Sequence, residues 1–132
     1  MTSDFSHKDM TSQKERKAIL VVEDEEEIRH ILQLVLSQEI SYPVLVVKNC
    51  SEALKTIQEI KPLLFLFNYQ LPEMTGIELY DQLHKKAEFM HVPTILMSAN
   101  LPKQEMQKRG IVGIEKPFDL DTIIDAIEHA LL

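Results

Sequence analysis

The sequence contains few of the residues on which several classes of protein depend. It has one cysteine, Cys50, so no disulfide can form within the chain, and a reducing cytoplasm is the expected compartment. It has three glycines, too few to supply a glycine-rich loop around a phosphate or a cofactor. It also shows no catalytic triad and no cluster of metal ligands. An enzyme active site is therefore poorly supported.

Long apolar runs and an excess of basic charge are missing as well. No apolar stretch approaches the roughly 18 residues of a membrane span, and the N-terminus lacks the apolar region of a signal peptide. Lys and Arg number 14 against 21 Asp and Glu, a net charge of −7. Because binding a nucleic acid requires basic side chains that neutralise phosphates, we expect no nucleic acid and no membrane, and favour a protein partner.

The length and composition predict one globular domain preceded by a short arm. The chain has 132 residues, of which 45% are hydrophobic, enough for a single packed core. Residues 1–17 show no hydrophobic period, so we interpret them as a flexible N-terminal arm. The arm holds four basic and three acidic residues, a net charge of +1. Residues 18–132 then form the domain.

Two kinds of segment alternate along this domain. Short apolar runs rich in β-branched residues predict strands buried on both faces, and they lie at 18–22, 44–47, 63–67, 94–97 and 111–114. Between them, apolar residues at helical spacing predict five helices. These are 26–37, a helix capped by Ser51 and ended by Pro62, a helix capped by Thr75, a short polar helix at 102–109, and a helix capped by Asp119. The alternation predicts an α/β fold, a doubly wound parallel sheet with helices on both faces.

Polar side chains follow these strands at the edge where such sheets bind ligands. Glu23 and Asp24 follow the first strand, and adjacent carboxylates there can hold a hard cation such as Mg²⁺. A solvated acidic turn that favours the next helix's dipole is the alternative. Asn68, Ser98 and Lys116 follow the third, fourth and fifth strands. A hydroxyl and an ammonium at neighbouring strand ends can contact the oxygens of one phosphoryl group.

The order of these motifs resembles the receiver domains of two-component response regulators. The resemblance covers residues 17–132. It rests on Val21-Val22-Glu23-Asp24, Leu71-Pro72-x-Met74-x-Gly76, Ser98-Ala99 and Lys116-Pro117-Phe118. It implies the flavodoxin-like receiver fold, with five strands in the order 2-1-3-4-5 and five helices. It also implies a cis peptide bond between Lys116 and Pro117.

The resemblance assigns a role to each residue at the strand ends. Glu23 and Asp24 match the acidic pair that binds Mg²⁺, Ser98 matches the hydroxyl that meets the phosphoryl group, and Lys116 matches the pocket lysine. Asn68 stands where the family has its phosphorylated aspartate. A carboxamide is uncharged and a poor nucleophile, so it cannot form the acyl phosphate. Because the site also loses one of three carboxylates, we expect no required cofactor and weak Mg²⁺ binding at best.

A second departure from the family lies at Gly113, three residues before Lys116. The family often has an aromatic switch residue there, and here no ring is available. The sequence therefore predicts a stand-alone, atypical receiver (a pseudo-receiver) that is not an enzyme. It would act in cytoplasmic phosphorelay signalling through protein–protein interaction, without aspartyl phosphorylation. An asparagine introduced at position 68 is the alternative explanation of that residue, and one substitution would not explain Gly113.

The resemblance also points to a partner surface, the face made by the fourth helix, fifth strand and fifth helix. We expect it to bind a histidine kinase or an effector, with a homodimer as an alternative. An exposed Met106 would suit an adaptable contact, although Met106 could instead cover the sheet. The residues expected on this face are Lys103, Gln104, Met106, Gln107, Ile111, Asp125 and His129.

Two other functions remain open from the sequence. The first is a phosphorelay member with a non-standard acceptor, such as Ser98 or a histidine. The five histidines show no phosphotransfer context, so each is better explained as a surface residue. The second, less favoured, is an enzyme on a flavodoxin-like fold.

Overall fold

The computed structural model describes residues 16–132, and the predicted arm lies outside them except for its last two residues. The five strands are β1 (Lys17–Val22), β2 (Val44–Val47), β3 (Lys61–Asn68), β4 (Thr94–Ser98) and β5 (Val112–Glu115). The helices are α2 (Glu26–Glu39), α3 (Cys50–Thr56), α4 (Gly76–His84), α5 (Lys103–Arg109) and α6 (Leu120–Ala130), with a 3-10 turn η1 (Ala87–Phe89). All strand pairs are parallel, in the order β2-β1-β3-β4-β5. The predicted fold is confirmed.

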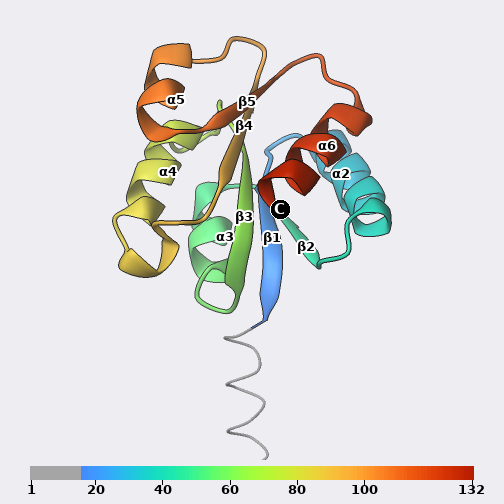
Figure 1. Ribbon diagram of the computed structural model, residues 1–132, viewed down its shortest axis with the longest axis horizontal. Coiled ribbons are helices and arrows are strands. Elements are labelled where there is room, and N and C mark those ends of the chain that lie inside the picture. The colour runs from blue at the N-terminus through green and yellow to red at the C-terminus, as the bar shows by residue number, and fades with distance from the viewer. Residues whose placement is uncertain (1–15) are drawn as a thin grey trace, which may run out of the picture.

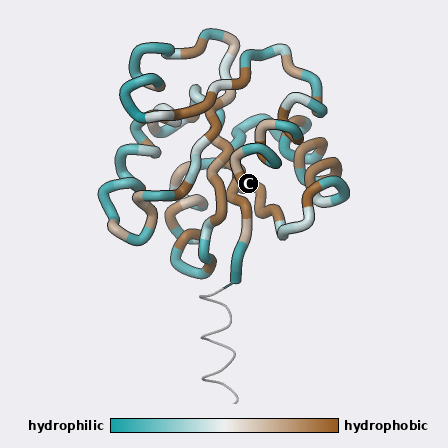
Figure 2. The backbone as a smooth tube through the Cα atoms, in the orientation of Figure 1, coloured by the Kyte–Doolittle hydropathy of each residue, from teal (hydrophilic) through white to brown (hydrophobic). Residues whose placement is uncertain are grey.

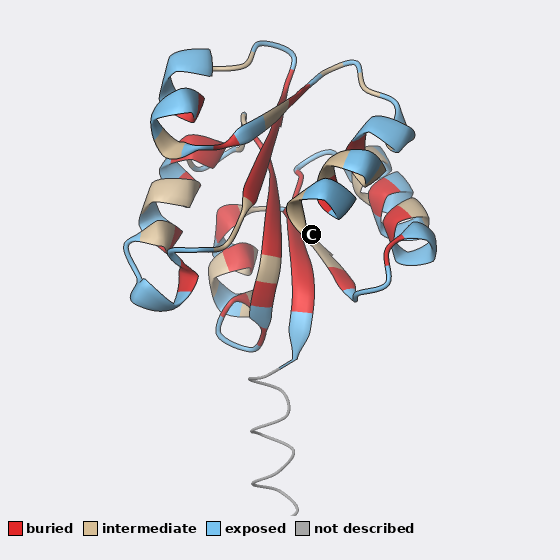
Figure 3. Cartoon of the chain, in the orientation of Figure 1, coloured by how far each residue is buried: buried red, intermediate tan, exposed pale blue. Residues whose placement is uncertain are grey.

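Helices cover both faces of the sheet (Figure 1). Helices α2 and α6 lie on one face, and α3, α4 and α5 lie on the other. Side chains that alternate along β1 enter different cores: Leu20 and Val22 pack toward α3 and α4, while Ile19 and Val21 pack toward α2 and α6. This explains why the strands are continuous apolar runs, visible as brown segments in Figure 2 and as buried red segments in Figure 3.

Two predicted element boundaries are wrong. Asn49, not Ser51, caps α3, because its side chain accepts a hydrogen bond from the backbone N–H of Glu52. Pro62 does not end a helix; it lies in β3, and α3 already ends at Thr56. The pairing of β1 with β3 shifts register between Ala18 and Ile19 and skips Leu63. This bulge accommodates a proline, which cannot donate to a regular ladder.

The predicted caps of α4 and α6 are confirmed. Thr75 caps α4 in a capping box with Glu78, and the Asp119 side chain accepts from the Thr122 N–H at the start of α6. The peptide bond between Lys116 and Pro117 is cis, as expected. The loop between β3 and α4 therefore ends at Thr75, and the segment between β5 and α6 ends at Asp119.

The first residue of α3, Cys50, is buried beneath the loop that follows β3. The carboxylate of Glu73, in that loop, accepts from the Cys50 N–H at 2.9 Å and from the Ser51 hydroxyl at 2.7 Å. These bonds fasten the loop to the start of α3. Within residues 16–132, no helix has the length and apolar character needed to cross a membrane.

Candidate functional site

Three strand ends meet at one edge of the sheet, as the βα order predicts. Asn68 ends β3 beside the acidic turn after β1 and the lysine after β5. The Lys116 Nζ donates to Asn68 Oδ1 at 3.1 Å, and Asn68 Nδ2 donates to Asp24 Oδ1 at 2.9 Å. Asn68 is thus the link between the lysine and the acidic pair.

The orientation of the Asn68 carboxamide follows from its neighbours. Its nitrogen also donates to the Gln70 carbonyl at 2.9 Å and lies 3.5 Å from Glu23 Oε2. Carboxylate and carbonyl oxygens can only accept, whereas an ammonium can only donate. Only one of the two amide orientations satisfies all of these partners, with nitrogen toward the acids and oxygen toward Lys116.

Glu23 is fully buried, whereas Asp24 is exposed. Glu23 Oε2 accepts from the Glu25 N–H at 3.0 Å, and Oε1 has no hydrogen-bond partner within residues 16–132 but lies 3.6 Å from Lys116 Nζ. Burial raises the pKa of Glu23 above its usual range, and the Glu25 N–H and Lys116 oppose part of that rise. The two carboxylates therefore differ: one is a buried partner of Lys116 and the other faces solvent.

Arg29 is a site residue that the sequence analysis missed. Its Nη1 donates to the backbone carbonyls of Glu23, at 3.0 Å, and Asp24, at 2.7 Å. These bonds hold the acidic turn at the end of β1 in place. The available signal was a single basic residue one turn into a helix that begins with a run of glutamates.

Ser98 lies at the same edge, but its hydroxyl is used within its own loop. It donates to the Asn100 carbonyl and accepts from the Asn100 N–H, both at 3.1 Å. Its side chain is buried. The hydroxyl therefore closes the turn after β4, and the structure gives it no hydrogen bond to Asn68 or Lys116.

The space beside Gly113 is filled by neighbouring side chains. A Cβ atom added there would clash with Met106 Cε and lie 2.9 Å from Leu101 Cδ1. Met106 and Ile111 are only 7% and 8% exposed. Of the two alternatives for Met106, the structure therefore has the one in which it covers the sheet, and Ile111 is buried as well. The remaining residues of that face are exposed, namely Lys103, Gln104, Gln107, Asp125 and His129.

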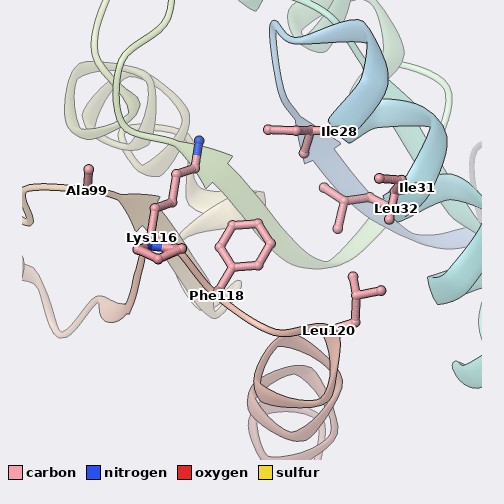
Figure 4. A pocket seen from close by; sticks show the side chains of 8 residues that line it. Ile28, Ile31, Leu32, Ala99, Lys116, Phe118 and Leu120 are labelled. Atoms are coloured by element: carbon pink, nitrogen blue, oxygen red, sulfur yellow. The ribbon is translucent and has the colours of Figure 1, made fainter.

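Beside the Asn68 pocket lies an apolar groove of about 490 Å³ that the sequence analysis did not anticipate (Figure 4). It runs between α2 and the segment that joins β5 to α6, with the Phe118 ring facing the side chains of α2. Its lining residues are Ile28, Ile31, Leu32, Ala99, Lys116, Pro117, Phe118 and Leu120. Ile31 is 48% exposed and Leu34, on the same helix, is 61% exposed. The available signal was an apolar stripe on α2 wider than one buried face requires.

The donor set of the pocket fits a divalent cation poorly. Of residues 16–132, Glu23 and Asp24 alone contribute carboxylates, and Asn68 directs its N–H groups toward oxygens of both. Within residues 16–132, no three His, Cys, Asp or Glu side chains are grouped so that they could hold a metal.

Comparison with known proteins agrees with this geometry. The family model described as "Response regulator receiver domain" matches residues 19–128. The polar-differentiation response regulator DivK of Brucella anthropi is 30% identical over 119 residues, which cover 87% of this chain and 96% of DivK. The structure of the chemotaxis protein CheY4 of Vibrio cholerae matches with a TM-score of 0.78 at 26% identity, covering 89% of this chain and 99% of that one.

Other relatives are longer proteins. Histidine kinase P4 of Formosa agariphila is 31% identical over 119 residues, which are 87% of this chain but 8% of the kinase. The match likewise spans 52% of a transcriptional regulatory protein of Bacillus subtilis. With a family match over most of its length, the chain belongs to the response regulator receiver domains, the signalling domains of two-component systems.

Proposed function

We propose that this chain is an atypical receiver that signals through protein contact and without phosphorylation at residue 68. The carrying observation is the bonding of Asn68. Its carbonyl oxygen accepts from Lys116, and its nitrogen donates to Asp24 and Gln70. A neutral carboxamide held in this way offers no anionic oxygen that could attack a phosphoryl donor.

Two further observations support a domain without the phosphorylation switch. The Ser98 hydroxyl bonds within its own loop. Gly113 carries no ring, and Met106 and Leu101 fill the adjoining space. We propose in addition that the chain has no catalytic activity of its own.

The apolar groove is the partner surface that the structure favours. Exposed Ile31 and Leu34 extend it along α2, and a cavity of about 490 Å³ can take several apolar side chains. The charges around it are mixed, since Lys116 lines the groove and the chain neighbours of its lining residues include Glu27, Arg29 and Asp121. An amphipathic helix with an apolar stripe complements such a surface. We propose that the partner, a histidine kinase or an effector, presents a helix of this kind.

Phosphorylation is tested by incubating the protein with acetyl phosphate and Mg²⁺, followed by intact-mass measurement. We expect no mass gain, because the nucleophile is missing. The matched comparison is Asn68→Asp, which restores the carboxylate in a nearly isosteric side chain. A gain of one phosphoryl group in the wild type, mapped to the pocket by fragmentation, would overturn the proposal.

The groove is tested by capturing partners from the native host with wild-type protein and two variants of α2. Ile31→Asp places a charge in the groove, whereas Gln38→Asp adds the same charge at an exposed position outside it. We expect a specific histidine kinase or effector to be lost with Ile31→Asp and retained with Gln38→Asp. If both variants retain the partner, the interface lies on another face.

A further inference from the structure

We infer that the side-chain amide of Asn68 takes the place of a divalent cation in the receiver pocket. Its nitrogen lies among three oxygen atoms, two from the turn at the end of β1 and one from the loop after β3. Asp24 Oδ1 and the Gln70 carbonyl oxygen are each 2.9 Å away, and Glu23 Oε2 is 3.5 Å away. A positively polarised NH₂ group thus stands where these oxygens converge.

A hard divalent cation cannot share this position with the amide. Such an ion needs about six oxygen ligands whose lone pairs point toward it. Here the lone pairs of Asp24 and Gln70 are directed at the hydrogens of Asn68. The Asn68 oxygen is directed away from them, toward Lys116. A bound ion would have to break these bonds and leave the buried NH₂ group without partners, which is costly.

The same network supplies what an ion would supply, namely a link between the acidic pair and the rest of the pocket. The Lys116 ammonium polarises the carboxamide, which strengthens the bonds that its nitrogen donates. Through Gln70, the amide also fixes the start of the loop after β3, whose other end is tied by the bridge between Gln70 and Thr75. The pocket and this loop therefore keep one arrangement in the absence of metal.

The first test uses wild-type protein with metal alone. Thermal unfolding in EDTA and in millimolar Mg²⁺ is expected to give the same Tm, because no ion binds preferentially to the folded pocket. In ¹H–¹⁵N spectra, the Asn68 side-chain resonances should not shift with Mg²⁺ or broaden saturably with Mn²⁺. A saturable rise in Tm, with broadening centred on Asn68, would overturn the inference.

Two variants test whether the Asn68 amide is the group that excludes the ion. Asn68→Asp should lower Tm in EDTA, through repulsion with Asp24 and Glu23, and Mg²⁺ should raise it again. The matched control Asn49→Asp also exchanges an amide for a carboxylate, at a cap where both residues serve equally, and should show no Mg²⁺ response. An Asn68→Asp protein whose Tm ignores Mg²⁺ would show that the amide is not what excludes the ion.

The inference stands apart from the proposed function. A wild-type protein that binds Mg²⁺ but gains no phosphoryl group would overturn the inference alone. One that gains the phosphoryl group would overturn the proposed function.

Discussion

An asparagine differs from an aspartate by an NH₂ group in place of one oxygen, and at position 68 this difference reverses the polarity of one corner of the pocket. Asn68 Nδ2 donates to oxygens that an aspartate would repel. The neighbouring Glu23 is fully buried, and among residues 16–132 the charged group near its Oε1 is the Lys116 ammonium, at 3.6 Å. Lys116 therefore has a structural role that does not depend on phosphate.

Removing the Lys116 ammonium should lower the free energy of unfolding, because Glu23 is buried beside it. Lys116→Met leaves the Glu23 carboxylate without a cation, and breaking a buried pair in this way costs about 3 kcal/mol in the free energy of unfolding. The measurement is urea denaturation. Adding Glu23→Gln should recover part of the loss, because the buried charge is then removed as well. A double variant no more stable than Lys116→Met would contradict this account.

The Asp81–Arg109 pair predicts an acid-sensitive part of the stability. Arg109 holds the pKa of Asp81 below its ordinary value of 3.8, through bonds of 2.7 and 2.8 Å. A lowered pKa in the folded state means that this contribution is complete above pH 3.8 and is lost as the pH falls through the folded-state pKa.

Denaturation at a series of acidic pH values tests this pair. Asp81→Asn should make the free energy of unfolding fall less steeply as the pH is lowered. The control Asp125→Asn should leave the slope unchanged, because Asp125 is exposed and has no ion pair within residues 16–132. Equal slopes in the wild type and Asp81→Asn would refute the assignment.

At the scale of elements, α5 is held against its neighbours by contacts on two sides. Met106 packs over Gly113 of β5, and Arg109 bonds to Asp81 of α4. The Tyr80 hydroxyl adds a bond to the Arg109 carbonyl at 3.1 Å. The helix that borders the α5–β5–α6 face is therefore fixed, and a ring at Gly113 would have no room to move beneath it.

A ring placed at Gly113 should be resisted by Met106. Gly113→Phe forces Met106 and Leu101 aside, and overpacking of this kind costs about 1–3 kcal/mol. Met106→Ala in the same chain should recover part of that cost by freeing the space. The coupling is measured as a double-mutant cycle in urea. Strictly additive effects would show that the ring does not compete with Met106.

At the scale of the whole molecule, the strand and helix order followed from the sequence because buried parallel strands must be continuous apolar runs. The convergence of Asn68 and Lys116 followed from βα order alone. Details that depend on tertiary contact did not follow. Asn49 and Ser51 are both good caps, but the Ser51 hydroxyl is bonded to Glu73 of the loop after β3, and Asn49 caps the helix. Met106 is buried because Gly113, seven residues later, leaves space for it.

The molecule offers two candidate interfaces, the groove beside α2 and the α5–β5–α6 face. Charge reversal at two exposed residues of the latter, Lys103→Glu with Asp125→Lys, should leave the fold and a groove-bound partner unaffected. It should weaken any homodimer built on that face, which sedimentation measures. If this double variant and Ile31→Asp both fail to capture the same partner, one interface extends over both surfaces.

The buried position of Cys50 has a consequence for experiments on this protein. Burial raises the pKa of its thiol to about 11, so at neutral pH the reactive thiolate is scarce as well as shielded. The rate at which an alkylating reagent modifies Cys50 should therefore report how often the domain opens. Because the chain has no other cysteine, one introduced at Leu34, beside the groove, would carry a fluorescent label selectively while Cys50 stays in place.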